Sequence, residues 1–363
     1  MGTSRDAGAV TSGTPERVAA ASPAHDVPIE SIEAAATVIA RHPGVVRTPI
    51  LGSRSAAALV AATHAVQLAG RAGDDIPRLF VKGEHLQATG SFKVRGALVR
   101  IASLSAAERE RGIITLSAGN HAQAVAWAAA IEGIPVTVVM PEGASAAKAA
   151  AARGYGAEVV LHGTHVGDTF ARMIELRDSL GLTFLHPFDD AAVIAGQGTV
   201  GLEILEDLPD VDVVVVGVGG GGLISGISAA IKQRRPSARV YGVEPTRSNA
   251  LSLALAAGEV VPLQPVSIAD GLGAPFAGAW TLDLTRRYVD GVVLLDDRAI
   301  ARGMRFALER MKQLLEPAGA AALAAVLEGR IPIETGDTVC AVASGGNVDL
   351  ARLPELLAMG DPG

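Results

Sequence analysis

The stretch that decides the fold is EHLQATGSFKVRGA, which occupies residues 84–97. Within it, Lys93 stands between a turn of small residues and an apolar run that is compatible with a helix. A lysine that is partly withdrawn from water has a lowered pKa, and its free amine can then attack an aldehyde to form a Schiff base. A solvated lysine at the start of a helix is the alternative. Three further stretches of the chain favour the reactive amine.

The bulk composition limits the class of protein. The chain has 363 residues, of which 49% are hydrophobic, and this suffices for two compact units or one split domain. The net charge of -7 and the lack of basic clusters beside aromatic residues argue against nucleic acid as a partner. No apolar run has the length of a membrane span, so we expect no membrane partner. The single cysteine, Cys340, excludes a disulfide framework and a thiolate metal site and indicates a reducing cytoplasm.

The amino-terminal segment predicts no structure. Residues 1–27 are rich in Ala, Ser, Gly, Thr and Pro and lack a continuous apolar core of signal-peptide length. We therefore expect a disordered tail over residues 1–27 and no export.

Strand-like and helical segments alternate between residues 112 and 189. Apolar runs at 113–117, 136–140 and 158–162 are each followed by a helical stretch. This alternation predicts a parallel sheet built from right-handed crossovers. We expect a small α/β domain over residues 112–189, inserted into a larger domain made of residues 28–111 and 190–356.

A run of four glycines follows the buried strand VDVVVVG at residues 211–217 and precedes a helix. Backbone N–H groups and the positive end of a helix together form an anion pocket there, which suits a phosphate. With Gly217 and the acidic Glu244, the same glycines also fit the dinucleotide fingerprint, so a nicotinamide site is a second hypothesis. The four glycines are Gly219, Gly220, Gly221 and Gly222.

Two polar loops complete the pattern. SAGNHAQA at residues 117–124 closes a strand and opens a helix, so its N–H groups can receive a carboxylate and Asn120 can reach a ring hydroxyl. An ordinary helix N-cap is the alternative, and we assign His121 no catalytic role because a lone histidine at a helix start is more often structural. SGGNVD at residues 344–349 follows the last strand, where Ser344 could bond a heterocycle nitrogen or simply form a turn.

In this order, GSFK, SAGNH, the four glycines and SGGN resemble the fold-type II family of pyridoxal-phosphate enzymes. Within that family they resemble the branch of threonine/serine dehydratases (threonine ammonia-lyases) and serine racemases. The similarity extends over residues 28–356 and includes FDDAAVIAGQGT at 188–199, SIADGLG at 267–273 and EPAGA at 316–320. It implies an α/β fold of two parallel-sheet domains, with the small one inserted in the large one, pyridoxal phosphate as cofactor, and a homodimer.

The resemblance also implies roles for the matching residues. Lys93 would hold the cofactor aldehyde beside Phe92, Asn120 would contact the ring hydroxyl, and Ser344 would face the pyridine nitrogen. The cofactor phosphate would be bound by Gly219, Gly220, Gly221, Gly222 and Leu223. The substrate carboxylate would be bound by Ser117, Ala118, Gly119, Asn120 and His121.

Three positions, compared with the family pattern, limit which reaction and which metal site we expect. The Ser344 hydroxyl cannot keep the pyridine nitrogen protonated as an aspartate would, and this weaker electron sink favours elimination over amine exchange. Racemases of the family carry a serine where Ala118 stands, so we expect dehydration with little racemisation. Glu244 matches a cation-site glutamate, but Ser248, Asn249 and Ala250 stand where a second acidic residue is expected, so no metal site is assigned beyond Glu244 as a candidate ligand.

The predicted function is dehydration of L-threonine or L-serine, an amino-acid substrate, to 2-oxobutanoate or pyruvate plus ammonia. Dehydration of 3-hydroxyaspartate or a phenylserine, an ectoine-pathway role, serine racemisation, a nicotinamide-dependent dehydrogenase and a cofactor-binding protein without catalysis are the alternatives. GSFK fits the threonine/serine branch better than the hydroxyaspartate branch, where we would expect GAFK. The chain leaves no room for a C-terminal regulatory domain after SGGN, so we expect no feedback by isoleucine.

Overall fold

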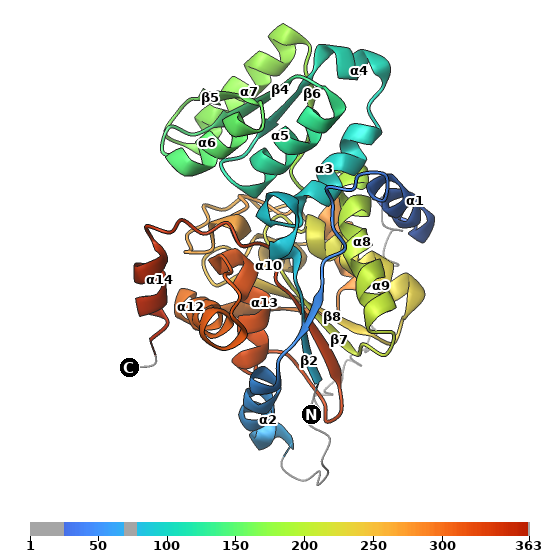
Figure 1. Cartoon of the computed structure of the whole chain (residues 1–363), viewed down its shortest axis with the longest axis vertical. Helices are drawn as coiled ribbons and strands as arrows, with labels where there is room; N and C mark the ends of the chain where they lie inside the picture. The colour runs from blue at the N-terminus through green and yellow to red at the C-terminus, as the bar shows by residue number, and fades with distance from the viewer. Residues whose placement is uncertain (1–24, 69–77, 362–363) are drawn as a thin grey trace, which may run out of the picture.

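Two parallel sheets, each accompanied by helices, make up the protein, as the computed structural model in Figure 1 shows. The structure describes residues 25–68 and 78–361. The larger sheet has the order β1-β2-β10-β7-β8-β9, and only β1 pairs antiparallel with its neighbour. Its strands are β1 Ile50–Gly52, β2 Arg78–Lys82, β7 Val213–Gly217, β8 Arg239–Pro245, β9 Gly291–Leu295 and β10 Thr338–Val342.

The smaller sheet has the order β5-β4-β3-β6 and is parallel throughout. Its strands are β3 Ile113–Leu116, β4 Val136–Met140, β5 Glu158–Leu161 and β6 Thr183–Phe184. The helices are α1 Ile29–Ile39, α2 Arg54–Leu68, α3 Lys93–Ala102, α4 Ala106–Arg111, α5 Asn120–Glu132, α6 Ala146–Gly154, α7 Val166–Leu180, α8 Ala191–Asp207, α9 Gly222–Arg234, α10 Ala250–Ala257, α11 Ala279–Tyr288, α12 Asp297–Phe306, α13 Pro317–Leu327 and α14 Leu353–Met359.

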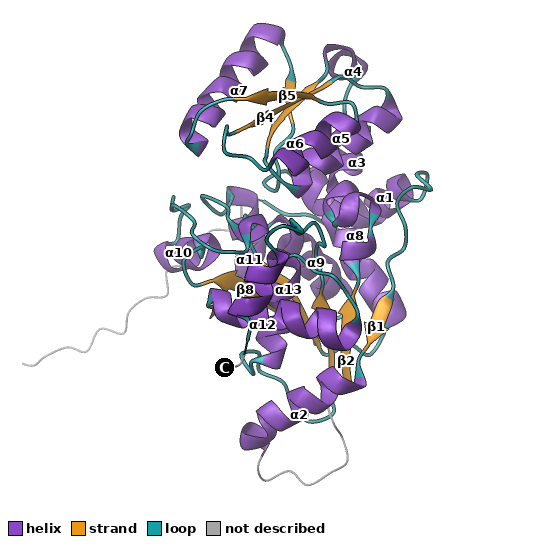
Figure 2. Cartoon of the chain, turned by 60° about the vertical axis from the view of Figure 1, so that its left-hand side comes forward, coloured by secondary structure: helices purple, strands orange, loops and turns teal. Residues whose placement is uncertain are grey.

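The larger sheet is buried on both faces, which explains why its central strand β7 is apolar without interruption. In β7, Val213 and Val215 join the core that contains α13, whereas Val214 and Val216 join the core on the opposite face, with α9. Successive side chains of a strand point to opposite faces, so a strand covered on both sides needs apolar residues at every position. Figure 2 shows helices on both sides of these strands.

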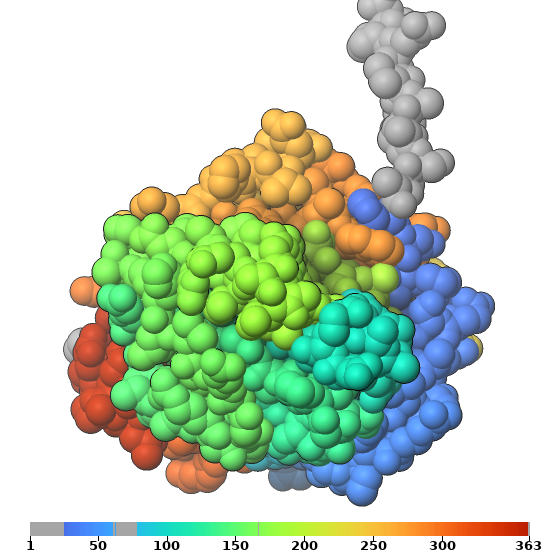
Figure 3. Space-filling model, turned by 90° about the horizontal axis from the view of Figure 1, so that it is seen from above, coloured from blue at the N-terminus to red at the C-terminus, as the bar shows by residue number. Residues whose placement is uncertain are grey.

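Helix α3 lies between the two sheets. Its residues Val94, Leu98 and Ile101 share a core with Ile113 of β3, and the helix also packs on α8. The small sheet thus takes part of its core from outside the segment 112–189, and the domain limits stay a prediction. Seen from above, the small unit, coloured from cyan to yellow-green, covers much of the face in Figure 3.

The fold class predicted from the sequence is confirmed, but the predicted tail is too long. Residues 1–24 lie outside the described residues. Residues 25–27, in contrast, are packed against the body: Val27 is 1% exposed, His25 Nδ1 lies 2.8 Å from Asp283 Oδ2, and Asp26 pairs with Arg287. The buried Val27 is the reason why the prediction of a disordered tail is wrong for residues 25–27. No helix in the described part of the chain is long and apolar enough to cross a membrane.

Replacing Gly226 by alanine should destabilise the larger unit. A Cβ at this position of α9 would lie 2.3 Å from the carbonyl oxygen of Ile194 and 2.5 Å from the nitrogen of Gly198, both in α8. Backbone atoms cannot give way as side chains do, so we expect a loss of about 1–3 kcal/mol in urea denaturation. Gly154→Ala in α6 is the control, because its Cβ would meet nothing within 4 Å. That change should be neutral or stabilising by at most about 1 kcal/mol, and equal effects of both would contradict the close approach.

Candidate active site

A strained turn directly precedes Lys93, the first residue of α3. Two short 3-10 turns, at Glu84–Leu86 and Ala88–Gly90, connect β2 to the helix. Thr89 (φ 58°) and Gly90 (φ 73°) both adopt the left-handed conformation, which glycine tolerates best. A Cβ at Gly90 would lie 2.3 Å from Asn347 Oδ1, so this turn is packed tightly against the loop after β10.

The Lys93 amine is half-buried and lies against aromatic and main-chain groups. Its Nζ donates a hydrogen bond to the carbonyl oxygen of Pro187 at 2.8 Å and lies 5.1 Å from the centre of the Phe92 ring. Burial lowers the pKa of Lys93 to about 8, so much more of the amine is neutral near physiological pH than in an exposed lysine. Burial also lowers the pKa values of His121 and His186, and the nearby Lys93 charge acts in the same direction. This is the environment of a nucleophilic amine.

The glycine run forms a tight turn, called here the glycine cradle, at the start of α9. Gly221, with φ of 94°, precedes the helix and no side chain caps it, so the first N–H groups of α9 lack intrahelical partners. A Cβ at Gly220 would lie 2.4 Å from the Phe188 ring, and one at Gly221 would lie 2.8 Å from Thr281. Only glycine fits here, and its N–H groups and the helix dipole suit a phosphate.

The rest of this turn is equally confined. A Cβ at Gly222 would lie 2.9 Å from the carbonyl oxygen of Phe188, and one at Gly219 would lie 3.2 Å from that of Gly271. Leu223 is buried within the core beside α9, at 5% exposure. Its side chain therefore anchors the turn, and only its main chain could make the predicted contact with the phosphate.

Asn120 is held from two sides. Gly119 is the N-cap of α5 and offers no side chain, so the Asn120 side chain is not used for capping. Its Nδ2 donates to Glu316 Oε1 at 2.5 Å, and its Oδ1 accepts from Asn347 Nδ2 at 2.9 Å. Asn347 Nδ2 also donates to the carbonyl oxygen of Thr89 at 2.7 Å, which ties this amide to the Lys93 turn.

The other predicted residues are brought to the same place. Ser344 follows β10, is 5% exposed, and its carbonyl oxygen accepts a hydrogen bond from the Phe92 N–H at 3.2 Å. Ser117 follows β3, and its Oγ accepts from the Gly119 N–H at 3.2 Å. The Nε2 of His121 is buried without a hydrogen-bond partner. An unpartnered buried nitrogen beside Lys93 fits a site that a polar ligand completes.

Glu244 does not face this site. It is 0% exposed, and its carboxylate accepts from the N–H groups of Leu251 at 2.8 Å and Ser252 at 2.9 Å, which caps α10. The carboxylate is thus already satisfied by protein donors, so neither a cation nor a ribose hydroxyl is needed to explain it. Among the residues that the structure describes, no group of three or more His, Cys, Asp or Glu could hold a metal ion.

Several site residues had no role in the sequence-based prediction. Glu316 belongs to EPAGA and Asn347 to SGGN, but neither motif by itself indicates a function for these two side chains. Phe188 and His186 form an edge-to-face pair with ring centres 4.6 Å apart, next to the Pro187 carbonyl that binds Lys93. Phe188 is the first residue of the motif FDDAAVIAGQGT, and this motif is the sequence feature that could have indicated the aromatic residues next to Lys93.

The profile of the family described as pyridoxal-phosphate dependent enzymes matches residues 41–345. The chain belongs to this family. An L-threonine ammonia-lyase of Thermotoga maritima is 45% identical over 284 residues, which are 78% of this chain and 70% of that protein. The catabolic L-threonine dehydratase of Escherichia coli is 44% identical over 286 residues, 78% of this chain and 87% of that protein.

Solved structures agree with this membership in the pyridoxal-phosphate family. Maize serine racemase has a TM-score of 0.82 at 35% identity and covers 92% of this chain and 97% of its own. Threonine deaminase isoform 2 of Solanum lycopersicum has a TM-score of 0.81 at 30% identity, with coverage of 94% and 98%. The predicted family, fold class and cofactor are confirmed, and the nicotinamide alternative is left without support. The roles of individual residues stay predictions.

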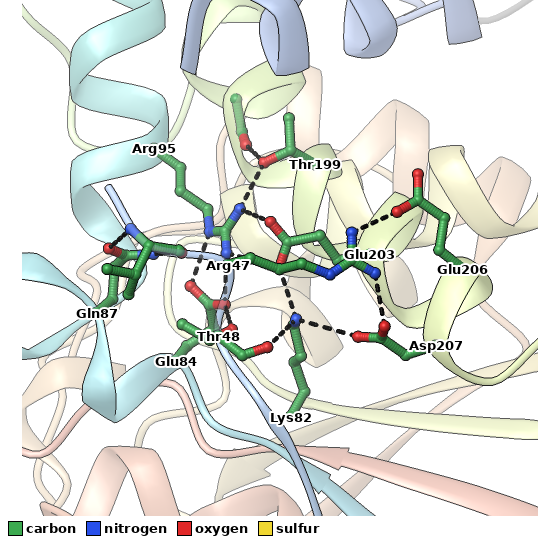
Figure 4. A network of polar contacts seen from close by, with 12 residues as sticks. Arg47, Thr48, Lys82, Glu84, Gln87, Arg95, Thr199, Glu203, Glu206 and Asp207 are labelled. Atoms are coloured by element: carbon green, nitrogen blue, oxygen red, sulfur yellow. Dashed lines mark hydrogen bonds and ion pairs between the residues drawn. The ribbon is translucent and has the colours of Figure 1, made fainter. Parts of the chain in front are cut away.

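A buried network of charges holds the start of α3 to the larger unit (Figure 4). Arg95, two residues after Lys93, is 0% exposed and donates two hydrogen bonds of 2.8 Å to Glu84 and two, of 2.7 and 3.0 Å, to Glu203. Lys82 Nζ donates to Glu203 Oε2 at 2.6 Å and to the carbonyl oxygen of Thr48 at 2.7 Å. The network joins β2, α3 and α8 directly behind the reactive amine.

Replacing Arg95 by glutamine should destabilise the protein strongly. Glu84 would keep a buried carboxylate without its guanidinium partner, and such a loss typically costs about 3–5 kcal/mol. The control is Arg302→Gln, because Arg302 pairs with Glu328 at 2.7 Å in a partly exposed position. Losing that pair should cost less than about 1 kcal/mol, and urea denaturation of both variants compares the two sites. Similar losses would contradict the role of the buried network.

Lys93 should react with aldehydes at a lower pH than exposed lysines. Only the neutral amine attacks, so trapping of a simple aldehyde on Lys93 by cyanoborohydride should rise with pH through a midpoint of about 8. The measurement is mass spectrometry of the Lys93 peptide from the cofactor-free protein. A midpoint near about 10.4, the value of an exposed lysine, would contradict the lowered pKa.

Proposed function

We propose that this enzyme dehydrates L-threonine and L-serine by α,β-elimination of water, giving 2-oxobutanoate or pyruvate and ammonia. The proposal rests on the Lys93 amine. Its Nζ donates a hydrogen bond to the Pro187 carbonyl oxygen, and the glycine cradle and the Asn120 loop belong to the same site. Relatives 44–45% identical are named for L-threonine, and this supports the same substrate class here.

The residues present fit pyridoxal phosphate. The uncapped start of α9 after Gly221 suits its phosphate, Lys93 beside Phe92 suits its aldehyde, Asn120 suits its ring hydroxyl and Ser344 its pyridine nitrogen. When bound, this group supplies an electron-withdrawing ring that stabilises negative charge on the α-carbon of the substrate.

The chain itself would bind the substrate and move protons. The N–H groups at the start of α5, after Gly119, bind the substrate carboxylate and orient the amino acid. The neutral Lys93 amine then takes the α-proton at Nζ as general base, which its lowered pKa favours. The Pro187 carbonyl, which accepts a hydrogen bond from Nζ, orients the amine.

The test is a visible spectrum of the purified protein together with keto-acid assays on L-threonine and on L-serine. We expect absorbance from the cofactor bound to Lys93 and formation of 2-oxobutanoate. Lys93→Ala should lose that absorbance and slow turnover by roughly 10²- to 10⁴-fold or more. Colour without keto acid from either substrate would refute dehydration of threonine and serine and direct the search to other β-hydroxy amino acids.

Introducing a hydroxyl at position 118 should allow a proton to be returned to the substrate α-carbon on the face opposite Lys93. Ala118 has no group that could return a proton to the face opposite Lys93, so the wild type should racemise L-serine little. Ala118→Ser should raise D-serine formation, measured by chiral chromatography, while dehydration continues. Ala130→Ser, at an exposed position near the other end of α5, is the matched control. Equal D-serine formation by both variants would contradict this assignment.

We also infer a homodimer that works in the cytoplasm, as expected for this branch. The single, fully buried Cys340 supports a reducing compartment, since it cannot form a disulfide within the chain. Sedimentation analysis of the purified protein tests the dimer, and a monomer at all concentrations would refute it.

A further inference from the structure

Glu316 is a buried carboxyl group for which the proposed reaction has no use so far. It is 3% exposed and stands immediately before α13, where its side chain makes no capping bond. Its Oε1 accepts from Asn120 Nδ2, and a Cβ at Gly345 would lie 2.3 Å from the same oxygen. The carboxyl group thus lies between Asn120 and the residue that follows Ser344.

The contacts of Asn120 leave its amide one orientation. Its Oδ1 accepts from Asn347, and its Nδ2 donates to Glu316. A flipped amide would set its NH₂ against the NH₂ of Asn347 and its oxygen against the Glu316 carboxylate, so both hydrogen bonds would be lost. An amide nitrogen carries two hydrogens, and after the bond to Glu316 one remains available to a ligand.

The charges around Glu316 come from both units. Asp270, in the short turn Asp270–Leu272 of the larger unit, and Lys148, in α6 of the smaller one, pair at 2.5 Å. The pKa of Glu316 is raised to about 7, because burial and the Asp270 charge raise it by more than the Asn120 hydrogen bond and the Lys148 charge lower it. Glu316 therefore changes its charge within the neutral range.

We propose that Glu316 is a positioning residue, whose carboxylate holds the Asn120 amide in the one orientation that offers a hydrogen to the cofactor ring hydroxyl. The proposal rests on the placement of the cofactor given above. An ionised carboxylate is a stronger acceptor than a neutral acid, and a protonated one can itself become a donor. The hold on Asn120 is therefore weakest below pH 7 and strengthens as the pH rises through the pKa of Glu316, about 7.

Glutamine at position 316 separates this effect from that of Lys93. Its amide oxygen can still accept from Asn120, but it carries no charge and does not titrate. Lys93 titrates in wild type and variant alike, so the ratio of their cofactor dissociation constants isolates Glu316. Glu328→Gln, at the other end of α13 and bonded to Arg302, is the matched control.

The experiment titrates the cofactor-free proteins with pyridoxal phosphate between about pH 6 and pH 8.5, a range that spans the pKa of about 7, with absorbance as the readout. We expect Glu316→Gln to bind within about twofold of wild type at the acid end and roughly tenfold more weakly at the alkaline end, the loss expected for a charged hydrogen bond. Glu328→Gln should follow wild type throughout.

The outcomes separate the possible roles. A pH-independent ratio, or wild-type binding by Glu316→Gln, would overturn the proposal. A purely structural role would lower the thermal unfolding midpoint of the cofactor-free variant without a pH-dependent ratio, and this too would overturn it. If the pH-dependent ratio is found but no keto acid forms from threonine or serine, the proposed reaction falls and the role of Glu316 stands.

Discussion

The position of Lys93 depends on the buried guanidinium of Arg95. Bringing an arginine and two carboxylates out of water is costly, and only hydrogen bonds to every partner compensate for it. Arg95 meets this condition by bonding Glu84 on one side and Glu203 on the other. Since Glu84 follows β2 and Glu203 lies in α8, a shift of α3 against either element would leave a buried charge unpaired. The network thereby restricts α3 to one position, and Lys93 with it.

Close main-chain packing imposes the second constraint. Helices α8 and α9 approach so closely that a Cβ at Gly226 would lie 2.3 Å from a backbone oxygen, and a Cβ at Gly220 or Gly221 would collide with the side chain of Phe188 or Thr281. The segment after β6 therefore serves two purposes. Its Phe188 ring fills the space above Gly220, and the Pro187 carbonyl beside it binds the Lys93 amine. One short segment thus fixes the position of the Lys93 amine relative to the glycine turn that we propose for the phosphate.

Much of this arrangement could be predicted from local sequence. Uninterrupted apolar runs such as that of β7 indicate doubly covered strands, and Lys93 and the four glycines stand out by their neighbours. What could not be predicted are contacts between distant segments: Asn120 meets Glu316 across 196 positions and Asn347 across 227. No local pattern states which acid will face which amide. The same holds for His25, whose bond to Asp283 orders a segment that looks unstructured by composition.

The two titrating groups of the site share one requirement, because each must lose a proton. In the proposed reaction Lys93 must lose its proton to act as nucleophile and base, and burial lowers its pKa to about 8. Glu316 must also be deprotonated to hold Asn120, and burial brings its pKa up to about 7. Desolvation disfavours charge on both, so the same dry surroundings move the two pKa values toward each other. The pKa of Glu316 is the lower of the two, so its carboxylate forms before Lys93 loses its proton as the pH rises. As the pH rises, the amide that faces the cofactor is therefore fixed before the amine becomes reactive, and both conditions are met near and above pH 8.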